Sequence, residues 1–544
     1  MGRVRRLPAG RVRPALIGRG SIVRARMASL ALARRRLAGA RLPVTPLASA
    51  GLVAALVLVS LLLRSRGLGG PFWIDEGLSV GISSFPFFEI PSILRFDGSP
   101  PLYYLLLHVW MELFGRSEGA THVLSLIFAL ASIPVGLWAG WSLFGPRAGW
   151  FCAGLFALNP FLTAYSHETR MYSLMVLLGL VATAAFVHAF VLDRRRFAIV
   201  FGVALALMLY THNWAIFFIG ASGAALIGLA HQRSEQRGSI LRHGGLAFGT
   251  AILVWLPWVP TLAFQITHTG APWANVPTLG DIQSGMGAVV GGLGPAIGLL
   301  LVAGTGVSHI VRRRRSIERL EMLTLAGLGI GTLLLAWGAS QISPAWAFRY
   351  LAVVVGPLML LTGVGLARAR RQGVAALALV ALLWLPQGVS PEPATSERSV
   401  TDEVEPLLDR GDLVVSTHPE RTTVLDYYLP RGVRYMTSLG PVEDPRYMDW
   451  RDALGRLEEA RASKTIGPTL DRLDTGRDIL LVRPVTEISD QWKAPWTELV
   501  RKRSAQWARL LREDSRFVRR AVAPDGPTPA ESGVRATLYT KVND

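Results

Sequence analysis

Long runs of hydrophobic residues recur between residues 47 and 385, separated by short polar or basic segments. Such runs approach the ~20 residues that a helix needs to cross a bilayer. Because only helices and closed barrels satisfy their backbone groups in lipid, the continuous runs favour helices over the alternating pattern of barrel strands. The pattern predicts about eleven spans: Leu47–Leu63, His122–Leu143, Ala148–Tyr165, Tyr172–Leu192, Phe197–Tyr210, Trp214–Ala230, Leu246–Phe264, Ala288–Ile310, Leu323–Trp337, Tyr350–Ala367 and Val374–Leu385.

Arginine clusters follow every second predicted span, which fixes the expected orientation. Residues 1–46 contain many arginines and no acidic residue, so we expect a basic cytosolic segment without stable structure. The positive-inside rule then gives a multi-pass plasma-membrane protein with its N-terminus in the cytoplasm. The clusters placed on the cytosolic side are Arg147, Arg194–Arg196, Arg233 to Arg242, Arg312–Arg315 and Arg368–Arg371.

One hydrophobic run is not assigned as a span. Pro101–Phe114 is short and carries His108 and Glu112, and counting it as a span would turn the later arginine clusters outward. It is better explained as a helix lying in the membrane interface, within a large outer loop formed by residues 65–121. We expect Leu78–Phe96 to be a second such helix.

The composition changes after Pro391, and residues 397–544 contain no hydrophobic run long enough to span. The pattern predicts a transmembrane domain over residues 47–390 and a small extracytoplasmic α/β domain over 397–544. We expect no second active site there, because no glycine-rich phosphate loop or nucleophile motif is visible, and favour a structural or acceptor-handling role. The expected strands are 412–416, 423–429, 478–485 and 536–542, and the expected helices are 450–461 and 496–512.

Composition and charge narrow the class further. Hydrophobic residues make up 51% of the chain and charged residues 17%, as expected for a membrane protein. A net charge of +19 would suit nucleic-acid binding, but the basic residues flank the hydrophobic runs, so no nucleic-acid partner is expected. Cys152 is the only cysteine, which excludes disulfides and cysteine-based metal sites within the chain.

The candidate chemistry begins at Pro71–Gly77, just past the first span, where Asp75 and Glu76 are the first acidic residues of the chain. Ionisable groups close to a membrane are costly and are often functional. Glu168 follows a later span on the same predicted face, so these three carboxylates can converge and supply a general base. Asp75 and Glu168 are also candidate ligands for a divalent cation. Solvated loop acids, or a salt bridge between Glu168 and Arg170, are the structural alternatives.

Two arginines do not follow the preference of basic residues for the cytosolic side. Arg170 and Arg349 fall on the predicted outer face, where a guanidinium can bind phosphate in a bidentate fork. Snorkelling to the interface is the alternative for Arg349. His108, His167 and His212 lie near the same face, but their spacing defines no zinc site, so hydrogen-bonded structural roles are favoured.

Several segments together resemble the GT-C superfamily of membrane glycosyltransferases, especially the branch containing protein O-mannosyltransferases and lipid A aminoarabinose transferases. They are Asp75–Glu76, Pro100–Tyr104 with the Leu113–Gly115 end of its helix, Asn159–Pro160 before Tyr165–Tyr172, and Arg349–Tyr350. The resemblance covers about residues 47–370 and implies an α-helical polytopic membrane protein of GT-C type. The C-terminal domain lies outside it.

The resemblance implies an inverting glycosyltransferase that takes a sugar from a polyprenyl-phosphate carrier on the outer face. The acceptor would be a hydroxyl of a cell-envelope lipid, polysaccharide or protein. By position, Asp75 matches the family's general base, Glu76 its neighbour and Glu168 a second acid, while Arg170 and Arg349 match phosphate contacts. The remaining expected pocket residues are Tyr103, Tyr104, His167, Tyr172 and His212. The chain departs from the aminoarabinose branch at Gly98–Ser99, where that branch has an acid–lysine pair.

Two other classes of protein share some of these features. A transporter or flippase for a lipid-linked or anionic substrate would also need arginines near the membrane, but the sequence has no inverted internal repeat and no acidic or arginine residue in mid-span. A non-catalytic scaffold with an outer domain leaves the Asp75–Glu76 pair unexplained. The sequence therefore favours the glycosyltransferase.

Overall fold

A computed structural model describes residues 46–311, 317–385, 397–486, 492–524 and 533–543 of the chain. It divides the chain into two compact units, residues 1–52 and 53–544. The first is described only through residues 46–52, which begin helix α2 (Pro46–Arg64). The predicted basic segment and the predicted boundary between residues 390 and 397 fall almost entirely outside the described residues.

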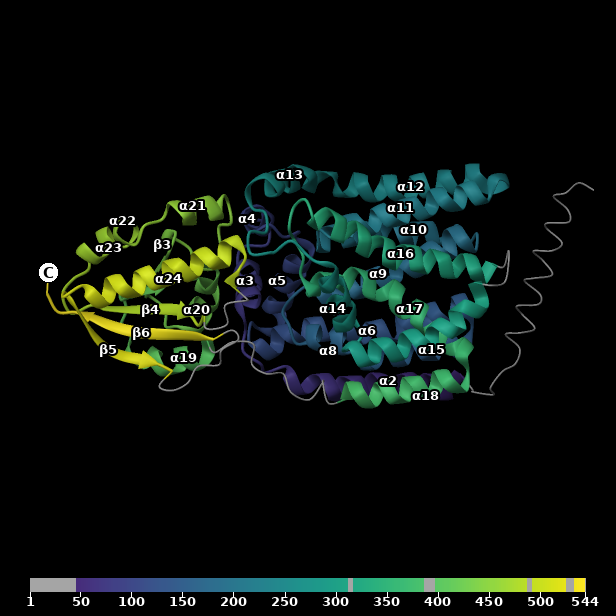
Figure 1. Cartoon of the computed structure of the whole chain (residues 1–544), viewed down its shortest axis with the longest axis horizontal. Helices are drawn as coiled ribbons and strands as arrows, with labels where there is room; N and C mark the ends of the chain where they lie inside the picture. Colours follow the sequence, from purple (N-terminus) through teal and green to yellow (C-terminus); the bar gives the residue numbers. More distant parts are fainter. Residues whose placement is uncertain (1–45, 312–316, 386–396, 487–491, 525–532, 544) are drawn as a thin grey trace, which may run out of the picture. The chain divides into compact units, whose positions relative to one another are not determined.

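Helices form most of the second unit up to residue 385 (Figure 1). Short helical turns extend several of them, as in the π-helix η2 after α9. The elements after the first loop region are α6 (Glu118–Phe144), α7 (Pro146–Leu158), α8 (Pro160–Ser166), α9 (Tyr172–Phe186), η2 (Val187–Val191), α10 (Phe197–Thr211), α11 (Ala215–Gln232), η3 (Ser234–Gln236), α12 (Arg237–Trp255), η4 (Leu256–Trp258), α13 (Val259–His268), α14 (Leu279–Val289), α15 (Leu293–Val311), α16 (Ile317–Ser340), η5 (Phe348–Leu351), α17 (Ala352–Ala369) and α18 (Arg371–Trp384).

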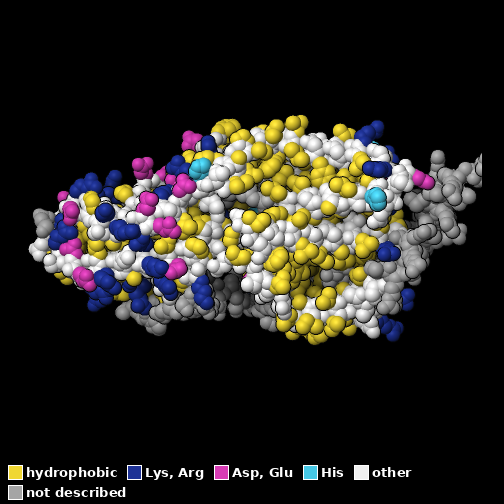
Figure 2. All heavy atoms as spheres, turned by 45° about the horizontal axis from the view of Figure 1, so that its top comes forward, with side chains coloured by type: hydrophobic (Ala, Val, Ile, Leu, Met, Phe, Trp, Pro, Cys, Tyr) yellow, Lys and Arg dark blue, Asp and Glu magenta, His cyan; other side chains and the backbone are white. Residues whose placement is uncertain are grey.

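Seven helices of the described chain are long and apolar enough to cross a membrane, or eight if the bent pair α14–α15 counts as one span. The other predicted spans correspond to α7 with α8, which are separate helices, and to α10 and α18, which are shorter apolar helices. The count of eleven stays a prediction. Figure 2 shows hydrophobic side chains over most of the helical surface, as expected of helices facing lipid.

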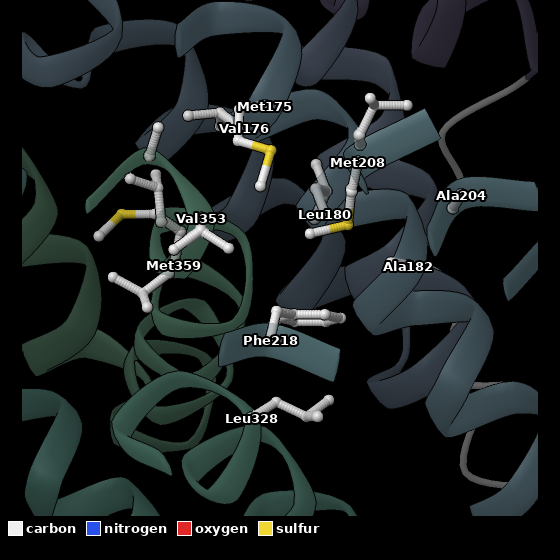
Figure 3. Close-up of a cluster of buried hydrophobic side chains, with 14 of the residues drawn as sticks. Met175, Val176, Leu180, Ala182, Ala204, Met208, Phe218, Leu328, Val353 and Met359 are labelled. Atoms are coloured by element: carbon white, nitrogen blue, oxygen red, sulfur yellow. The ribbon is translucent and has the colours of Figure 1, made fainter. Parts of the chain in front are cut away.

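The core of the helical part is built around α9 and α17, which lie among the other helices. Both helices are hydrophobic on all sides, and in each an apolar stretch of 18 residues is 83% buried. This is expected for helices with no lipid-facing stripe. Figure 3 shows part of this core, where side chains of α9, α10, α11, α16 and α17 interlock. The labelled residues are Met175, Val176, Leu180, Ala182, Ala204, Met208, Phe218, Leu328, Val353 and Met359.

Two breaks between consecutive helices, one between α7 and α8 and one between α14 and α15, lie against each other. Asn159 separates α7 from α8, because its side chain caps α8 by accepting a hydrogen bond from Leu162 N, and Pro160 starts α8. The second interruption, between α14 and α15, bends by 81° at Gly291–Gly292, which both have positive φ. Asn159 Nδ2 donates to Val289 O at 2.9 Å, and Trp384 Nε1 donates to Val290 O at 2.8 Å. Side chains therefore satisfy the carbonyl groups that the second break leaves open.

The loop region before α6 holds three helices: α3 (Ile74–Ser83), α4 (Ile90–Asp97) and α5 (Leu102–Phe114). The helix predicted at Pro101–Phe114 is confirmed as α5. The single helix predicted over Leu78–Phe96 is wrong, because Ser84 caps α3 and Pro86 follows, which cannot donate a helical hydrogen bond.

The C-terminal domain contains a six-stranded sheet in the order β3-β2-β1-β4-β6-β5. β1 pairs in parallel with both β2 and β4, and the remaining pairs are antiparallel. Its strands are β1 (Leu413–Ser416), β2 (Arg434–Thr437), β3 (Gly440–Val442), β4 (Asp478–Pro484), β5 (Phe517–Ala523) and β6 (Val534–Lys541). Its helices are α19 (Glu397–Val404), η7 (Glu405–Leu407), η8 (Pro419–Arg421), α20 (Thr422–Tyr428), α21 (Ala453–Glu459), α22 (Ala462–Thr465), α23 (Gly467–Asp471) and α24 (Pro495–Glu513).

The α/β character predicted for this domain is confirmed, with three of the four expected strands. The strand expected at 423–429 is wrong, since this segment is helix α20. Parallel strands need a crossover connection, and α20 supplies it between β1 and β2. Helix α24 lies along the sheet in Figure 1 and buries Trp507 and Leu511 against it. Figure 2 shows the charged side chains gathered over this domain.

Candidate active site

Helix α3 carries Asp75 and Glu76 in its first turn. Trp73, the residue before the helix, is extended, and its N–H donates to Glu76 Oε2 at 3.3 Å, so an acidic residue is used to start the helix. Both carboxylates also face the positive end of the helix dipole. Because successive helical residues point about 100° apart, the two neighbouring acids face different surroundings.

Asp75 lies between two arginines from distant parts of the chain. Its Oδ2 atom is 3.4 Å from Arg349 Nη2 and 3.8 Å from Arg170 Nη2. The Asp75 side chain is 18% exposed, so this ion pair is partly shielded from water. The three residues that the sequence offered separately as base and phosphate contacts therefore come together.

Arg170, in the loop between α8 and α9, is held in several ways. Its Nη1 atom donates to Asp75 O at 3.2 Å, to Ser79 Oγ at 3.1 Å and to Tyr104 OH at 3.2 Å. Its guanidinium also lies 5.8 Å from the ring of Tyr172. Within the described chain its Nε is shielded from solvent and has no hydrogen-bond partner, which leaves one donor for a ligand.

Arg349, in η5, is surrounded by aromatic rings. Its guanidinium lies 5.4 Å from the ring centre of Trp73, 5.3 Å from that of Trp273 and 5.5 Å from that of Tyr350. Cation–π contacts of this kind hold the charge in place. Its Nε, like that of Arg170, finds no hydrogen-bond acceptor among the described residues.

Glu76 faces the helical part and is 2% exposed. Its Oε1 atom lies 2.6 Å from His122 Nε2 of α6 and accepts a hydrogen bond from Thr169 N at 2.7 Å. With the bond from Trp73 N, both carboxylate oxygens are engaged by the protein. Glu76 thus fastens α3 to α6 and to the loop that carries Glu168 and Arg170.

Glu168 is partly buried, and its Oε2 atom is shielded from solvent without a hydrogen-bond partner in the described structure. Burial raises its pKa to about 8, and the negative charges of Glu76 and Asp75 act in the same direction against the opposing effect of Arg349 and Arg170. At neutral pH this side chain is mostly a neutral carboxylic acid. It can donate a hydrogen bond, which an ionised carboxylate cannot.

The two histidines of the predicted pocket are neutral groups. Burial lowers the pKa of His212 to about 3, helped by the charges of Arg170 and Arg349. Its ring lies 4.5 Å from that of Tyr350. Burial also lowers the pKa of His167, whose Nε2 lies against the carbonyl oxygen of Arg64. His212 therefore lines the site as an aromatic ring, whereas His167 packs beneath it.

The tyrosines of the predicted pocket divide in the same way. Tyr104 contacts Arg170 through its hydroxyl, and the shielded Tyr172 hydroxyl has no partner among the described residues. Tyr103 is fully buried, and its hydroxyl lies 3.0 Å from Ser125 Oγ, so it belongs to the core.

Several residues of the site were not predicted from the sequence. Trp73 and Trp273 contact Arg349, Ser79 contacts Arg170 and His122 contacts Glu76. Burial raises the pKa of Asp97, at the end of α4. The charge of Asp75 acts in the same direction, and that of Arg170 opposes it. Ser79 and Trp73 lie within about one helical turn of Asp75, and this spacing is the sequence signal that could have indicated them.

The residues present do not fit a divalent cation. No group of three or more His, Cys, Asp or Glu side chains is placed to hold a metal ion in the described parts of the chain. Asp75 faces two guanidinium groups instead, and Glu168 is protonated at neutral pH. Asp75 can accept a proton, and the arginines can hold an anion.

The described chain has a fold of the GT-C type, which the resemblance implied for residues 47–370. No protein-family model and no curated protein matches the sequence. Solved structures match its fold, among them ArnT from Cupriavidus metallidurans. In its apo state this protein gives a TM-score of 0.59 at 15% identity, over 81% of this chain and 94% of ArnT. Bound to undecaprenyl phosphate, it gives 0.60 at 14% identity, over 90% and 98%.

Two further structures show the same fold. The oligosaccharyltransferase of Archaeoglobus fulgidus in its apo form gives a TM-score of 0.52 at 12% identity, over 83% of this chain and 72% of its own. The arabinofuranosyltransferase AftD from Mycobacteria gives 0.51 at 14% identity, over 91% of this chain and 40% of its own. At these identities the likeness concerns the fold.

Proposed function

We propose that the chain is an inverting membrane glycosyltransferase that moves a sugar from a polyprenyl-phosphate-linked donor to an acceptor hydroxyl at the outer face of the membrane. The observation that carries this proposal is the placement of Asp75 between Arg170 and Arg349, each with a shielded Nε that lacks a partner in the described chain. A proton acceptor beside anion-binding groups is what the reaction requires. The fold shared with ArnT, which was solved bound to undecaprenyl phosphate, supports the choice of donor.

In this mechanism the donor phosphate binds first. Its anionic oxygens compete with Asp75 for Arg349 and Arg170, because each guanidinium can bind a phosphate in a fork. Asp75 loses ion-pair partners in this exchange and becomes available to the acceptor. Donor binding therefore prepares the base.

Transfer then forms one bond and breaks another. Asp75 takes the proton of the acceptor hydroxyl while the acceptor oxygen attacks the anomeric carbon from the face opposite the phosphate. The bond between that carbon and the phosphate oxygen breaks, and polyprenyl phosphate leaves with the electron pair. Arg349 and Arg170 hold the charge that develops on the phosphate. No proton is needed on the leaving oxygen, since a phosphate is a good leaving group.

The other residues keep this arrangement in place. Glu76 fastens α3, and Glu168, mostly neutral at pH 7, can donate a hydrogen bond to a bound ligand. We also propose a cytoplasmic N-terminus and an extracytoplasmic C-terminal domain, which would put the site at the outer face.

The test uses the full chain purified in lipid nanodiscs with a radiolabelled polyprenyl-phosphate sugar and cell-envelope extract as acceptor. We expect release of polyprenyl phosphate with label in the acceptor, and its loss in Asp75→Asn. Movement of the labelled lipid across vesicle membranes without transfer would instead support the transporter or flippase and overturn this proposal.

A further inference from the structure

Helix α3 is enclosed by two parts of the second unit. Seven of its ten residues are buried. Glu76 and Ser79 contact the helical part, as described above. Ile82 belongs to the core of the helical part, and Ser83 O lies 2.9 Å from His108 Nδ1 of α5. Two other buried residues face the C-terminal domain: Leu78 packs with Trp450 and Trp496, and Val80 packs with Val424.

The C-terminal domain presents to α3 the edge of its sheet where ligands usually bind. In open α/β sheets, ligands bind beyond the carboxyl ends of parallel strands, where the connections leave in opposite directions. β1 and its parallel neighbour β4 meet this description, because the helices that follow them, α20 and α24, pack on opposite faces of the sheet. The segments that follow β1, η8 and α20, pack against α3. Helix α3, which carries Asp75, therefore occupies part of the place where a ligand usually binds in such a sheet.

Two glycines, one helical turn apart, allow this close packing. A Cβ atom on Gly77 would lie 2.8 Å from Val424 N and 2.9 Å from Val424 Cα. A Cβ atom on Gly81 would overlap the carbonyl oxygen of Arg446. In both cases the obstacle is backbone, which cannot rotate away as a side chain can. Any larger residue must therefore push α3 and the C-terminal domain apart.

Tyr428 of α20 holds the segment that leads into α3. Its hydroxyl accepts a hydrogen bond from Phe72 N at 2.8 Å and donates one to Glu118 Oε1 at 3.1 Å. The domain therefore fixes the chain three residues before Asp75 and again at Gly77 and Gly81.

We propose that the C-terminal domain sets the position of Asp75 by holding α3 at Gly77 and Gly81 and the segment before it at Phe72, which makes Gly77, Gly81 and Tyr428 positioning residues for sugar transfer. The inference rests on the proposed function. Arg349 belongs to η5 and not to α3, so a shift of α3 changes the distance between Asp75 and Arg349. A displacement of ~1 Å at a catalytic group can lower turnover by ~100-fold.

The experiment compares Gly77→Ala, Gly81→Ala and Tyr428→Phe with Gly455→Ala as the matched control. Gly455 lies in α21 of the same domain and has no atom within 4 Å of its added Cβ. Alanine is the better helix former, so the first two variants cannot lose activity by unwinding α3. For the full chain in nanodiscs we measure kcat, KM for the polyprenyl-phosphate sugar, and hydrogen–deuterium exchange of the α3 amides.

We expect kcat to fall by about 10- to 100-fold in both glycine variants, with a smaller change in donor KM, because Arg349 lies in η5 and only the contacts of Arg170 with Asp75 O and Ser79 Oγ move with α3. We expect exchange in α3 to rise by about fivefold in Tyr428→Phe, and the Gly455→Ala protein to match the wild type. A glycine variant with wild-type kcat, or one that changes only donor KM, would overturn the positioning role.

The two proposals fail in different ways. If the wild-type chain transfers no sugar, the proposed function is wrong, and the exchange measurement still tests whether the domain holds α3. Wild-type exchange in all three variants would then overturn the inference. If the wild type is active and the glycine variants are equally active, the function stands and the positioning role does not.

Discussion

Arg349 Nη2 lies 3.4 Å from Asp75 Oδ2, although η5 and α3 belong to opposite ends of the helical part of the sequence. This ion pair makes the base and the anion-binding group compete with each other. An anion that binds Arg349 removes an ion-pair partner from Asp75. Loss of either side chain likewise leaves the other without this partner.

Replacing Asp75 by Asn should separate binding from turnover. The amide keeps the size of the side chain and cannot accept the acceptor proton, so transfer should fall by ~10²- to 10⁴-fold. Donor binding should stay equal or become tighter, because Arg349 and Arg170 lose a competing carboxylate. Titration with the polyprenyl-phosphate sugar and single-turnover transfer measure the two effects. Near-normal turnover would remove Asp75 from the mechanism.

Replacing Arg349 by Lys should weaken donor use. An ammonium group cannot reproduce the fork of a guanidinium or its contacts with Trp73 and Trp273. We expect donor KM to rise by about tenfold, and a similar change for Arg170→Lys. Arg509→Lys, on an exposed position of α24, is the matched control. Wild-type donor KM in both site variants would return these arginines to structural roles.

Glu76→Gln should act on stability more than on chemistry. The change removes the charge from the contacts with His122 and Thr169, and a buried hydrogen bond to a charged group contributes ~1.5–3 kcal/mol. Thermal unfolding should show the loss, and His122→Gln should give a similar one. Turnover per folded molecule should exceed that of Asp75→Asn. A stable Glu76→Gln protein with no turnover would assign Glu76 to the chemistry instead.

The pKa of Glu168 predicts how transfer depends on pH. The carboxyl group is protonated below about 8 and ionised above it. Transfer should therefore fall as the pH rises through about 8, because a second anion then faces the donor phosphate. Glu168→Gln imitates the neutral acid, so it should keep activity at neutral pH and lose this alkaline decline. An inactive Glu168→Gln protein would instead make Glu168 the base.

The orientation can be tested by thiol labelling in intact cells. Cys152 is buried, so an introduced cysteine can be followed alone. Ser92 and Ser463 are exposed, in the first loop region and in the C-terminal domain, and Ser234 is exposed between α11 and α12. Cysteines at Ser92 and Ser463 should react with an impermeant reagent, and one at Ser234 should not. Labelling of the Ser234 variant alone would reverse the orientation.

Hydrophobic runs were enough to predict the class of fold, because they follow directly from the cost of polar groups in lipid. The sequence also singled out Asp75, Arg170 and Arg349, which the structure brings together. The local pattern did not separate the roles of Asp75 and Glu76, and only the resemblance named Asp75 as the base and Glu76 as its neighbour. Neighbours on a helix point about 100° apart, and only the packing of α3 shows which one meets the arginines.

Other features depend on contacts that no local pattern encodes. The crossover helix α20 was predicted as a strand, since its role follows from the parallel pairing of β1 with β2. Trp273 enters the site through packing with the C-terminal domain, far along the chain from Asp75. Nothing in the local sequence distinguishes Gly77 and Gly81 from other helix positions. Their role follows from the backbone of the C-terminal domain, which lies against both of them.

The two helix interruptions at Asn159–Pro160 and Gly291–Gly292 cannot open independently. Asn159 and Trp384 supply the donors for the carbonyl groups of Val289 and Val290. A hydrocarbon chain that entered between α8 and α14 would deprive the Val289 carbonyl of the Asn159 donor. Each such loss costs several kcal/mol in an apolar medium. Separating α8 from α14 is therefore costly, and the proposed polyprenyl donor would enter the fold along another side at less cost.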